Sequence, residues 1–113
     1  MRINIKPLSV NECWQGKRFK TKKYNQYEDE MLYTLKPLKL PKSPYKVYYE
    51  FGFSSKLSDV DNCIKPLQDI LQKKYNFNDK DIIEMHVKKK LVKKGNEYLI
   101  FKIENYENKK NTD

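Results

Sequence analysis

Two aspartates, Asp59 and Asp61, stand two residues apart in the motif Asp-Val-Asp-Asn-Cys-Ile-Lys-Pro at residues 59–66, and Asp79 follows in a polar turn. They belong to a chain of 113 residues with a formal net charge of +9. Mg²⁺ prefers oxygen ligands and keeps several waters, so two or three carboxylates suffice for a site. A metal held there can activate water and stabilise charge on a phosphodiester. Acids of this kind in a basic protein are typical of a nuclease.

The spacing of the two aspartates constrains the chain around them. Residues two apart share a side only in an extended segment, and on a helix they point away from each other. Asp59 and Asp61 therefore converge on one ion only if the chain leading into the following helix is extended or irregular. Pro66 cannot donate a hydrogen bond to the carbonyl four residues back. We therefore expect the helix either to begin close to Lys65 or to be irregular in its first turn.

The same residues also have an ordinary structural interpretation. Asp61 and Lys65 could form an exposed ion pair one helical turn apart, which contributes a few tenths of a kcal/mol. Asp59 could cap the helix, and Asp79 suits a turn because its side chain hydrogen-bonds the nearby backbone. Asp-x-Asp alone is a weak signal, so these residues alone favour the structural interpretation.

A wider set of residues favours the nuclease. In chain order it reads Asp59, Asp61, Asn62, Lys65, Pro66, Asp69, Tyr75, Asn78 and Asp79. This order resembles the RusA family of Holliday-junction resolvases. Segments 6–11 and 17–24, with Trp14 between them, resemble the opening of that family, so the likeness covers nearly the whole chain. The resemblance implies a Mg²⁺-dependent homodimeric endonuclease that cuts four-way DNA junctions symmetrically.

The resemblance also implies roles for single residues. The essential acids of the family, which bind the metal, correspond to Asp59, Asp61 and Asp79, and its essential lysine corresponds to Lys65. That lysine would stabilise charge on the scissile phosphate or orient the attacking water. The turn often reads Asp-Asp in the family, whereas Asn78 takes the first place here. We align Asp79 with the second acid because Ile82 and Ile83 continue the pattern, and Asp81 competes for the role.

The composition favours an anionic partner. The isoelectric point is about 9.4, which is typical of proteins that bind nucleic acid. Two clusters flank the acidic motif: Lys17, Arg18, Lys20, Lys22 and Lys23, and Lys88, Lys89, Lys90, Lys93 and Lys94. Phosphate contacts from such residues supply salt-dependent affinity without sequence information, although a solvated lysine face has the same composition. Trp14 and Phe19 could stack on an open junction or anchor a loop to the core.

Apolar periodicity predicts an α+β fold in a single domain spanning residues 1–113. Alternation predicts strands near 3–5, 47–53, 83–87 and 99–103, and helical spacing predicts helices from about 21 to 36 and 61 to 74. The order β-α-β-α-β-β predicts a mixed sheet with helices packed on one face. Residues 93–96 are expected to form a hairpin turn between the last two strands. Residues 106–113 are expected to form a frayed polar tail.

Other expectations concern location and assembly. The chain has no apolar leader and no run of membrane-spanning length, so we expect a cytoplasmic protein without membrane contact. Cys13 and Cys63 are then expected to be reduced, and with only His86 beside them they do not make a zinc site. A homodimer is expected because a monomer would leave strand aromatics such as Tyr49 and Phe51, or their neighbours, in water.

Two other classes of function stay open. One is a small basic ribonuclease that works without metal, although that chemistry relies on His, Glu, Arg or Tyr, and a single histidine fits it poorly. The other is a non-catalytic nucleic-acid-binding module in which the aspartates are caps and surface charges. Metal-dependent cleavage of a junction separates the predicted nuclease from both.

Overall fold

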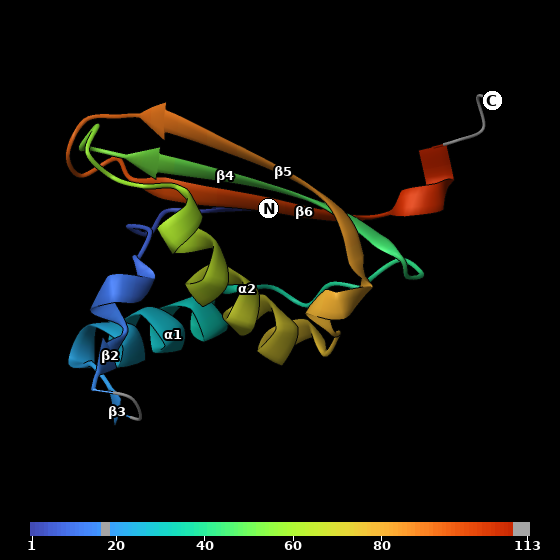
Figure 1. The fold of residues 1–113 in the computed structure, drawn as a ribbon, viewed down its shortest axis with the longest axis horizontal. Helices are drawn as coiled ribbons and strands as arrows, with labels where there is room; N and C mark the ends of the chain where they lie inside the picture. Colours follow the sequence, from blue (N-terminus) through green and yellow to red (C-terminus); the bar gives the residue numbers. More distant parts are fainter. Residues whose placement is uncertain (17–18, 110–113) are drawn as a thin grey trace.

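A computed structural model describes residues 1–16 and 19–109. Two helices cover one face of a four-stranded mixed sheet, and the other face is open (Figure 1). The sheet contains β1 (Arg2–Ile3), β4 (Tyr45–Phe53), β5 (Ile82–Leu91) and β6 (Tyr98–Asn105), and the helices are α1 (Lys22–Thr34) and α2 (Asp61–Tyr75). The predicted α+β class and the predicted order of the larger elements are confirmed.

Several short elements were not predicted from the sequence. β2 (Trp14–Gln15) and β3 (Phe19–Lys20) form a separate two-stranded sheet. Single 3₁₀ turns form η1 (Val10–Glu12), η2 (Asp79–Asp81) and η3 (Tyr106–Lys109). η3 lies in the segment expected to be frayed, and the Tyr106 amide donates to the Pro44 carbonyl at 2.9 Å. Residues 110–113 of that segment lie outside the described residues.

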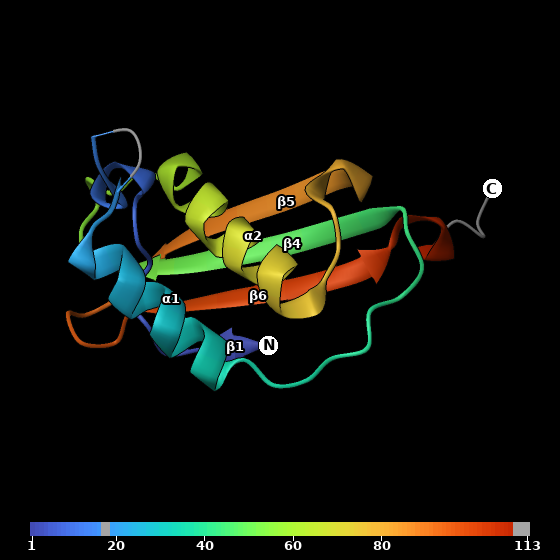
Figure 2. The ribbon, with the colours of Figure 1, turned by 90° about the horizontal axis from the view of Figure 1, so that it is seen from below.

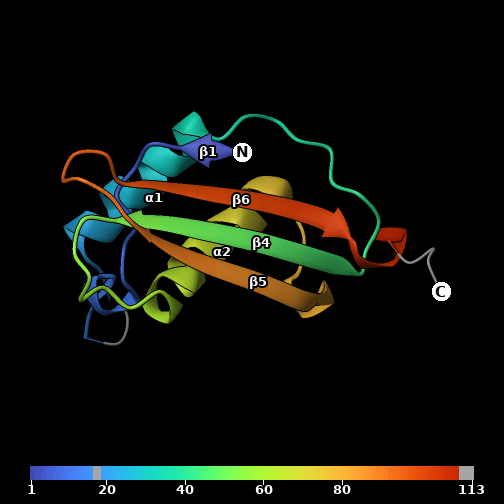
Figure 3. The ribbon, with the colours of Figure 1, turned by 90° about the horizontal axis from the view of Figure 1, so that it is seen from above.

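β4 occupies the interior of the sheet, whose strand order is β1-β6-β4-β5 (Figure 3). It pairs antiparallel with β6 and parallel with β5. The predicted hairpin between β5 and β6 is therefore wrong, because β4 lies between these two strands. α2 forms the crossover that a parallel pair requires. Val47, Tyr49 and Phe51 of β4 are completely buried, as is expected of a strand in the interior of a covered sheet.

The core lies between the sheet and the two helices (Figure 2). The helix-facing residues of β4 pack there with Met31 of α1 and Leu67 of α2, which have no exposed surface. Of the two sets of strand residues expected to face water in a monomer, Tyr49 and Phe51 are already covered by the helices; the homodimer stays a prediction. Only their neighbours on the strand face the open side, since side chains alternate along a strand.

α2 begins before its proline and continues through it. The helix starts at Asp61, contains Pro66 and ends at Tyr75. The Cys63 amide donates to the Val60 carbonyl, three residues back, at 3.1 Å, which is the tighter 3₁₀ spacing often found at helix ends. The expected start near Lys65 is therefore wrong, and the tighter hydrogen bond lies at the helix start rather than at Pro66.

Candidate nuclease site

A line of polar side chains runs along α2 at four-residue spacing and contains Asp61, Lys65 and Asp69. The Lys65 Nζ donates to Asp69 Oδ1 at 2.8 Å. Lys65 therefore forms its ion pair with Asp69, one turn further along the helix, and not with Asp61. The hydrogen bond to Asp69 raises the pKa of Lys65, and the charge of Asp79 adds to this effect. The side chain of Lys65 is 63% exposed. The line therefore presents a charged ammonium group to solvent at neutral pH.

Asp79 joins this line near the carboxyl end of α2. Its backbone amide donates to Gln72 Oε1 at 2.8 Å, and Gln72 Nε2 lies 3.5 Å from Asp69 Oδ1. Asn78, which departs from the family pattern, caps η2 by accepting the Lys80 amide at 3.0 Å. The turn therefore places Asp79 against the second half of the helix.

Asp59 and Asp61 lie at the opposite end of α2, and both are exposed. Val60 between them has helical angles, φ −66° and ψ −36°, and no hydrogen bond from a described side chain caps the helix. Asp59 therefore does not cap α2, contrary to the structural interpretation of this residue. The Asn62 Nδ2 lies 3.5 Å from Asp59 Oδ2. Because Val60 is helical, an extended chain does not turn the two carboxylates to one side.

The three predicted metal ligands do not gather in one copy of the chain. Asp61 and Asp69 are separated by about 12 Å along the helix axis, and Asp79 is held at Gln72, beyond Asp69. Within residues 1–16 and 19–109, no three His, Cys, Asp or Glu side chains are placed to hold one metal ion. The exposed carboxylates of Asp59 and Asp61 suit Mg²⁺ chemically. A site built from all three acids does not fit a single copy, and the metal site stays a prediction.

A cavity of about 390 Å³ opens beside Asp59. Its polar lining comes from three segments that are distant in sequence: Lys6, Ser9, Asn11 and Glu12 from the first, Ser54, Ser55, Ser58, Asp59 and Asn62 from the second, and Glu97 from the third. Asn11 and Glu12 were not predicted as site residues. The resemblance of segment 6–11 to the resolvase opening was the signal that could have found Asn11. The cavity gives the acidic motif a pocket of mixed character, because Pro7, Phe53 and Leu57 line it as well.

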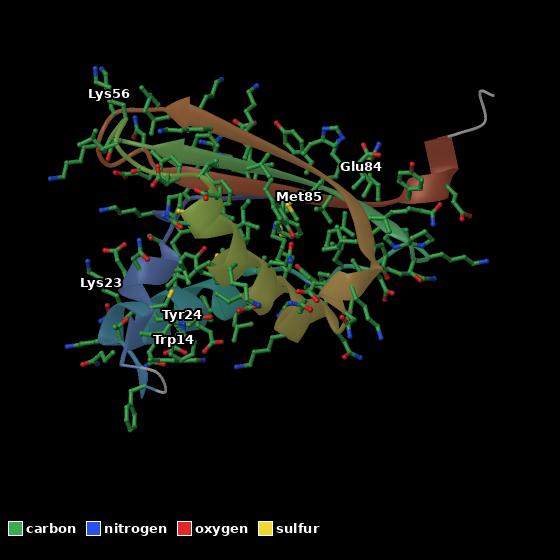
Figure 4. All side chains as sticks on the ribbon, in the orientation of Figure 1. Trp14, Lys23, Tyr24, Lys56, Glu84 and Met85 are labelled. Atoms are coloured by element: carbon green, nitrogen blue, oxygen red, sulfur yellow. The ribbon has the colours of Figure 1, made fainter. Side chains whose placement is uncertain are left out.

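Lys89 holds the loop that carries the acidic motif. Its Nζ donates to the carbonyls of Lys56 at 3.1 Å and Ser58 at 2.6 Å, and Lys56 lies at the end of the sheet where β5 finishes (Figure 4). Lys88 and Lys90 point to the opposite, open face, because side chains alternate along a strand. Of these three predicted DNA-binding lysines, Lys89 therefore positions the site, whereas Lys88 and Lys90 lie near Glu50 on the open face.

The first basic cluster is partly neutralised within the protein. The structure describes its members Lys20, Lys22 and Lys23, whereas Lys17 and Arg18 lie outside the described residues. Lys20 pairs with Glu28 at 2.9 Å, and Lys23 pairs with Glu12 at 2.8 Å. Lys22 is exposed. These ion pairs reduce the charge that Lys20 and Lys23 offer to a phosphate.

Glu50 organises the open face of the sheet. It accepts hydrogen bonds from the hydroxyl of Tyr48 at 2.7 Å and from that of Tyr98. The bond from Tyr98 contributes most to the lowered pKa of Glu50, and the bond from Tyr48 follows. The Arg2 guanidinium lies 3.9 Å from the centroid of the Tyr98 ring. This cluster ties β1, β4 and β6 together and fixes two aromatic rings on the open face.

β5 forms an edge of the sheet (Figure 3). Within the part of the chain that the structure describes, its outer side pairs with no other strand. The strand carries the exposed apolar residues Ile83, Met85 and Leu91. An edge strand with unpaired backbone groups is a template for pairing with another chain.

The two cysteines take no part in these clusters. Cys13 and Cys63 are free and buried. Burial raises the pKa of Cys13 to about 11 and that of Cys63 to about 12. Since the thiolate is the form that attacks and binds metals, neither cysteine is suited to either role.

No protein-family model matches the chain, and the search of curated proteins finds no match. None of the helices formed by the described residues is long and apolar enough to cross a membrane. The functional inference therefore depends on the residues and their geometry.

Proposed function

We propose that this protein is a Mg²⁺-dependent endonuclease that resolves four-way DNA junctions by paired symmetric cuts. The observation that carries the proposal is the exposed Asp59–Asp61 motif beside a cavity, in a chain of net charge +9. Exposed carboxylates repel phosphate unless a cation lies between them. A divalent ion bound there would activate water and stabilise developing charge on the phosphodiester. The resemblance to the RusA family supports a branched DNA substrate.

Lys65 contributes a positive charge that is already positioned. Its ammonium group is exposed, and the bond to Asp69 holds it on the same side of α2 as Asp61. A phosphate oxygen can accept a hydrogen bond from Lys65 in place of Asp69 or together with it, because both acceptors are anionic oxygens. On this proposal Lys65 binds the phosphate next to the cut, and Asp69 keeps the ammonium in place before DNA arrives.

The third acid reaches the site from a second copy of the chain. Asp79 lies just before the start of β5, whereas the loop that carries Asp59 contacts Lys89 near the end of the strand. In an antiparallel pairing of two β5 edge strands, the start of β5 in one copy would lie beside the end of β5 in the other. Asp79 of one copy would then lie at the same end of the paired strands as the Asp59 loop of the other. The same two-fold axis would generate two identical sites, as paired cuts require.

The charges along β5 suit this pairing. Glu84, which contacts His86 within the same copy, lies near the start of the strand, and Lys88 and Lys90 lie near its end on the same open face. A pairing centred on Val87 would place Glu84 of each copy opposite Lys90 of the other. Opposite charges directly across a strand pair contribute about 0.2–1 kcal/mol. Light scattering is expected to report about twice the chain mass of 13.7 kDa.

Cleavage of a synthetic four-way junction by the purified protein tests the proposal. We expect symmetric cuts with Mg²⁺ and none when EDTA removes the metal. Asp59→Asn and Asp61→Asn should each bind the junction without cutting it, because removing a carboxylate weakens the metal site and lessens the repulsion of phosphate. Junction binding without cutting by the unaltered protein would favour the non-catalytic binding module. Metal-independent cutting of RNA would favour the ribonuclease.

A further inference from the structure

The β2–β3 hairpin projects from the molecule at the end where α2 begins (Figure 1). Its register pairs Trp14 with Lys20 and Gln15 with Phe19. Neighbouring residues of a strand point to opposite faces, so the two aromatic rings lie on different faces of the hairpin. Phe19 is 72% exposed and Trp14 is 43% exposed. The hairpin therefore holds one largely free aromatic ring in water.

The base of the hairpin is firmly attached to α1. The ring of Trp14 meets that of Tyr24 edge-on, with centroids 5.6 Å apart (Figure 4). The Lys20 ammonium lies 5.0 Å from the centroid of the same Tyr24 ring. Thr21 caps α1 by accepting the Tyr24 amide at 3.1 Å, and its own amide donates to the Cys13 carbonyl at 2.9 Å. Trp14 is therefore the anchor that the sequence analysis considered, whereas Phe19 is not.

The hairpin is also linked to the cavity beside Asp59. The Thr21 hydroxyl donates to the carbonyl of Glu12 at 2.6 Å, and Glu12 lines that cavity. Lys22 follows the hairpin directly and is exposed. The exposed ring of Phe19 is thus carried on an extension of the cavity wall, next to a cation that no described acid neutralises.

We infer that Phe19 stacks on a base that is unpaired or unstacked at the branch point of a DNA junction, while Lys22 contacts a neighbouring phosphate. The inference rests on the proposed function and adds the contact that selects branched DNA over continuous duplex. Bases inside a duplex are already stacked, whereas bases at a branch point can leave the stack. Stacking of a base on an aromatic side chain tolerates any sequence, because every base has a π-face.

Binding experiments in EDTA test the inference without any cleavage. The probes are a four-way junction with 2-aminopurine at the branch point and a duplex of matching sequence. Phe19→Ala should weaken junction binding by about 5- to 150-fold, the range expected for one base–aromatic stack. It should also abolish the change in 2-aminopurine fluorescence that accompanies the move of the base from its neighbours onto the Phe19 ring. Duplex affinity and the salt dependence of binding should not change, because no charge is removed. Phe19→Trp should behave like the unaltered protein.

Tyr33→Ala is the matched control, because Tyr33 is 92% exposed on α1 and its removal also deletes a solvent-exposed ring. Equal junction affinities for Phe19→Ala and Tyr33→Ala would overturn the inference. A Phe19→Ala protein with half the native mass in light scattering would overturn it too, since Phe19 would then be a contact between copies. A protein that binds the junction through Phe19 but never cuts it would refute the nuclease alone. Failure to bind junctions at all would overturn both.

Discussion

Gly52 lies where β4 passes under the ring of Tyr98, and this close approach makes Gly52→Ala a sharp test of the open face. A Cβ at residue 52 would come within 3.0 Å of three Tyr98 ring carbons. Ordinary carbon–carbon contacts are about 3.5–4.0 Å. The ring must therefore move by roughly 1 Å, and its hydroxyl would leave the position in which it donates to Glu50.

Two losses set the size of the effect. Overpacking of a buried site costs about 1–3 kcal/mol. A hydrogen bond to a charged group contributes about 1.5–3 kcal/mol. We therefore expect Gly52→Ala to lower the free energy of unfolding by about 2.5–6 kcal/mol, against a total of about 5–15 kcal/mol for a domain of this kind.

Urea unfolding followed by circular dichroism measures this change. The midpoint should fall while the slope of free energy against urea stays the same, because the surface exposed on unfolding is unchanged. The control is the same substitution in a Tyr98→Ala background, where the ring that causes the clash is gone. There Gly52→Ala should cost less than about 0.5 kcal/mol, so the two positions should show strong coupling. Equal costs in the two backgrounds would refute the reasoning.

Three further predictions address charge. The pKa of Glu50 in the folded protein lies below its ordinary value of 4.5. The ionised carboxylate therefore stabilises the fold above pH 4.5, and this stabilisation is lost as the pH falls through the pKa of the folded state. Acid unfolding of Glu50→Gln should depend less on pH in that window. Asp79→Asn should abolish junction cutting and Asp81→Asn should not; the reverse result would shift the third acid by two positions. Junction affinity should fall with salt with a log–log slope of roughly −4 to −7, for about five to eight phosphate contacts, and Lys88→Ala should make it shallower. A slope near zero would make both basic clusters ordinary solvated surface.

The fold followed from local pattern, but the strand partners did not. Alternation in residues 47–53 identified β4, and Thr21 marked the start of α1, because these signals depend on neighbours in sequence. β5 pairs with β4 because β4 is the strand that is buried in the interior of the sheet. Alternation of apolar residues identifies a strand, but it does not show which strand is interior. A short polar turn before Tyr98 resembles a hairpin signal whether or not the flanking strands pair.

The candidate site shows the same limit. Asp59, Asp61 and Lys65 were identified by spacing and resemblance, both of which are visible in one short segment. The contacts of Lys89 with the loop and of Gln72 with Asp79 join residues that tertiary structure brings together. No local pattern predicts such contacts. Asp79 is separated from Asp59 and Asp61 because α2 crosses over between the parallel strands β4 and β5. The sequence did not predict that these two strands pair.

Mixed dimers of Asp59→Asn and Asp79→Asn test the central claim most directly, on a junction that the unaltered protein cuts in Mg²⁺. If each site combines Asp59 of one copy with Asp79 of the other, a mixed dimer has one site with both substitutions and one intact site. Each variant alone should be inactive. Refolded together, they should nick one strand, with about a quarter of all sites intact on statistical pairing of two-fold dimers. A mixture as inactive as its separate components would contradict the shared site.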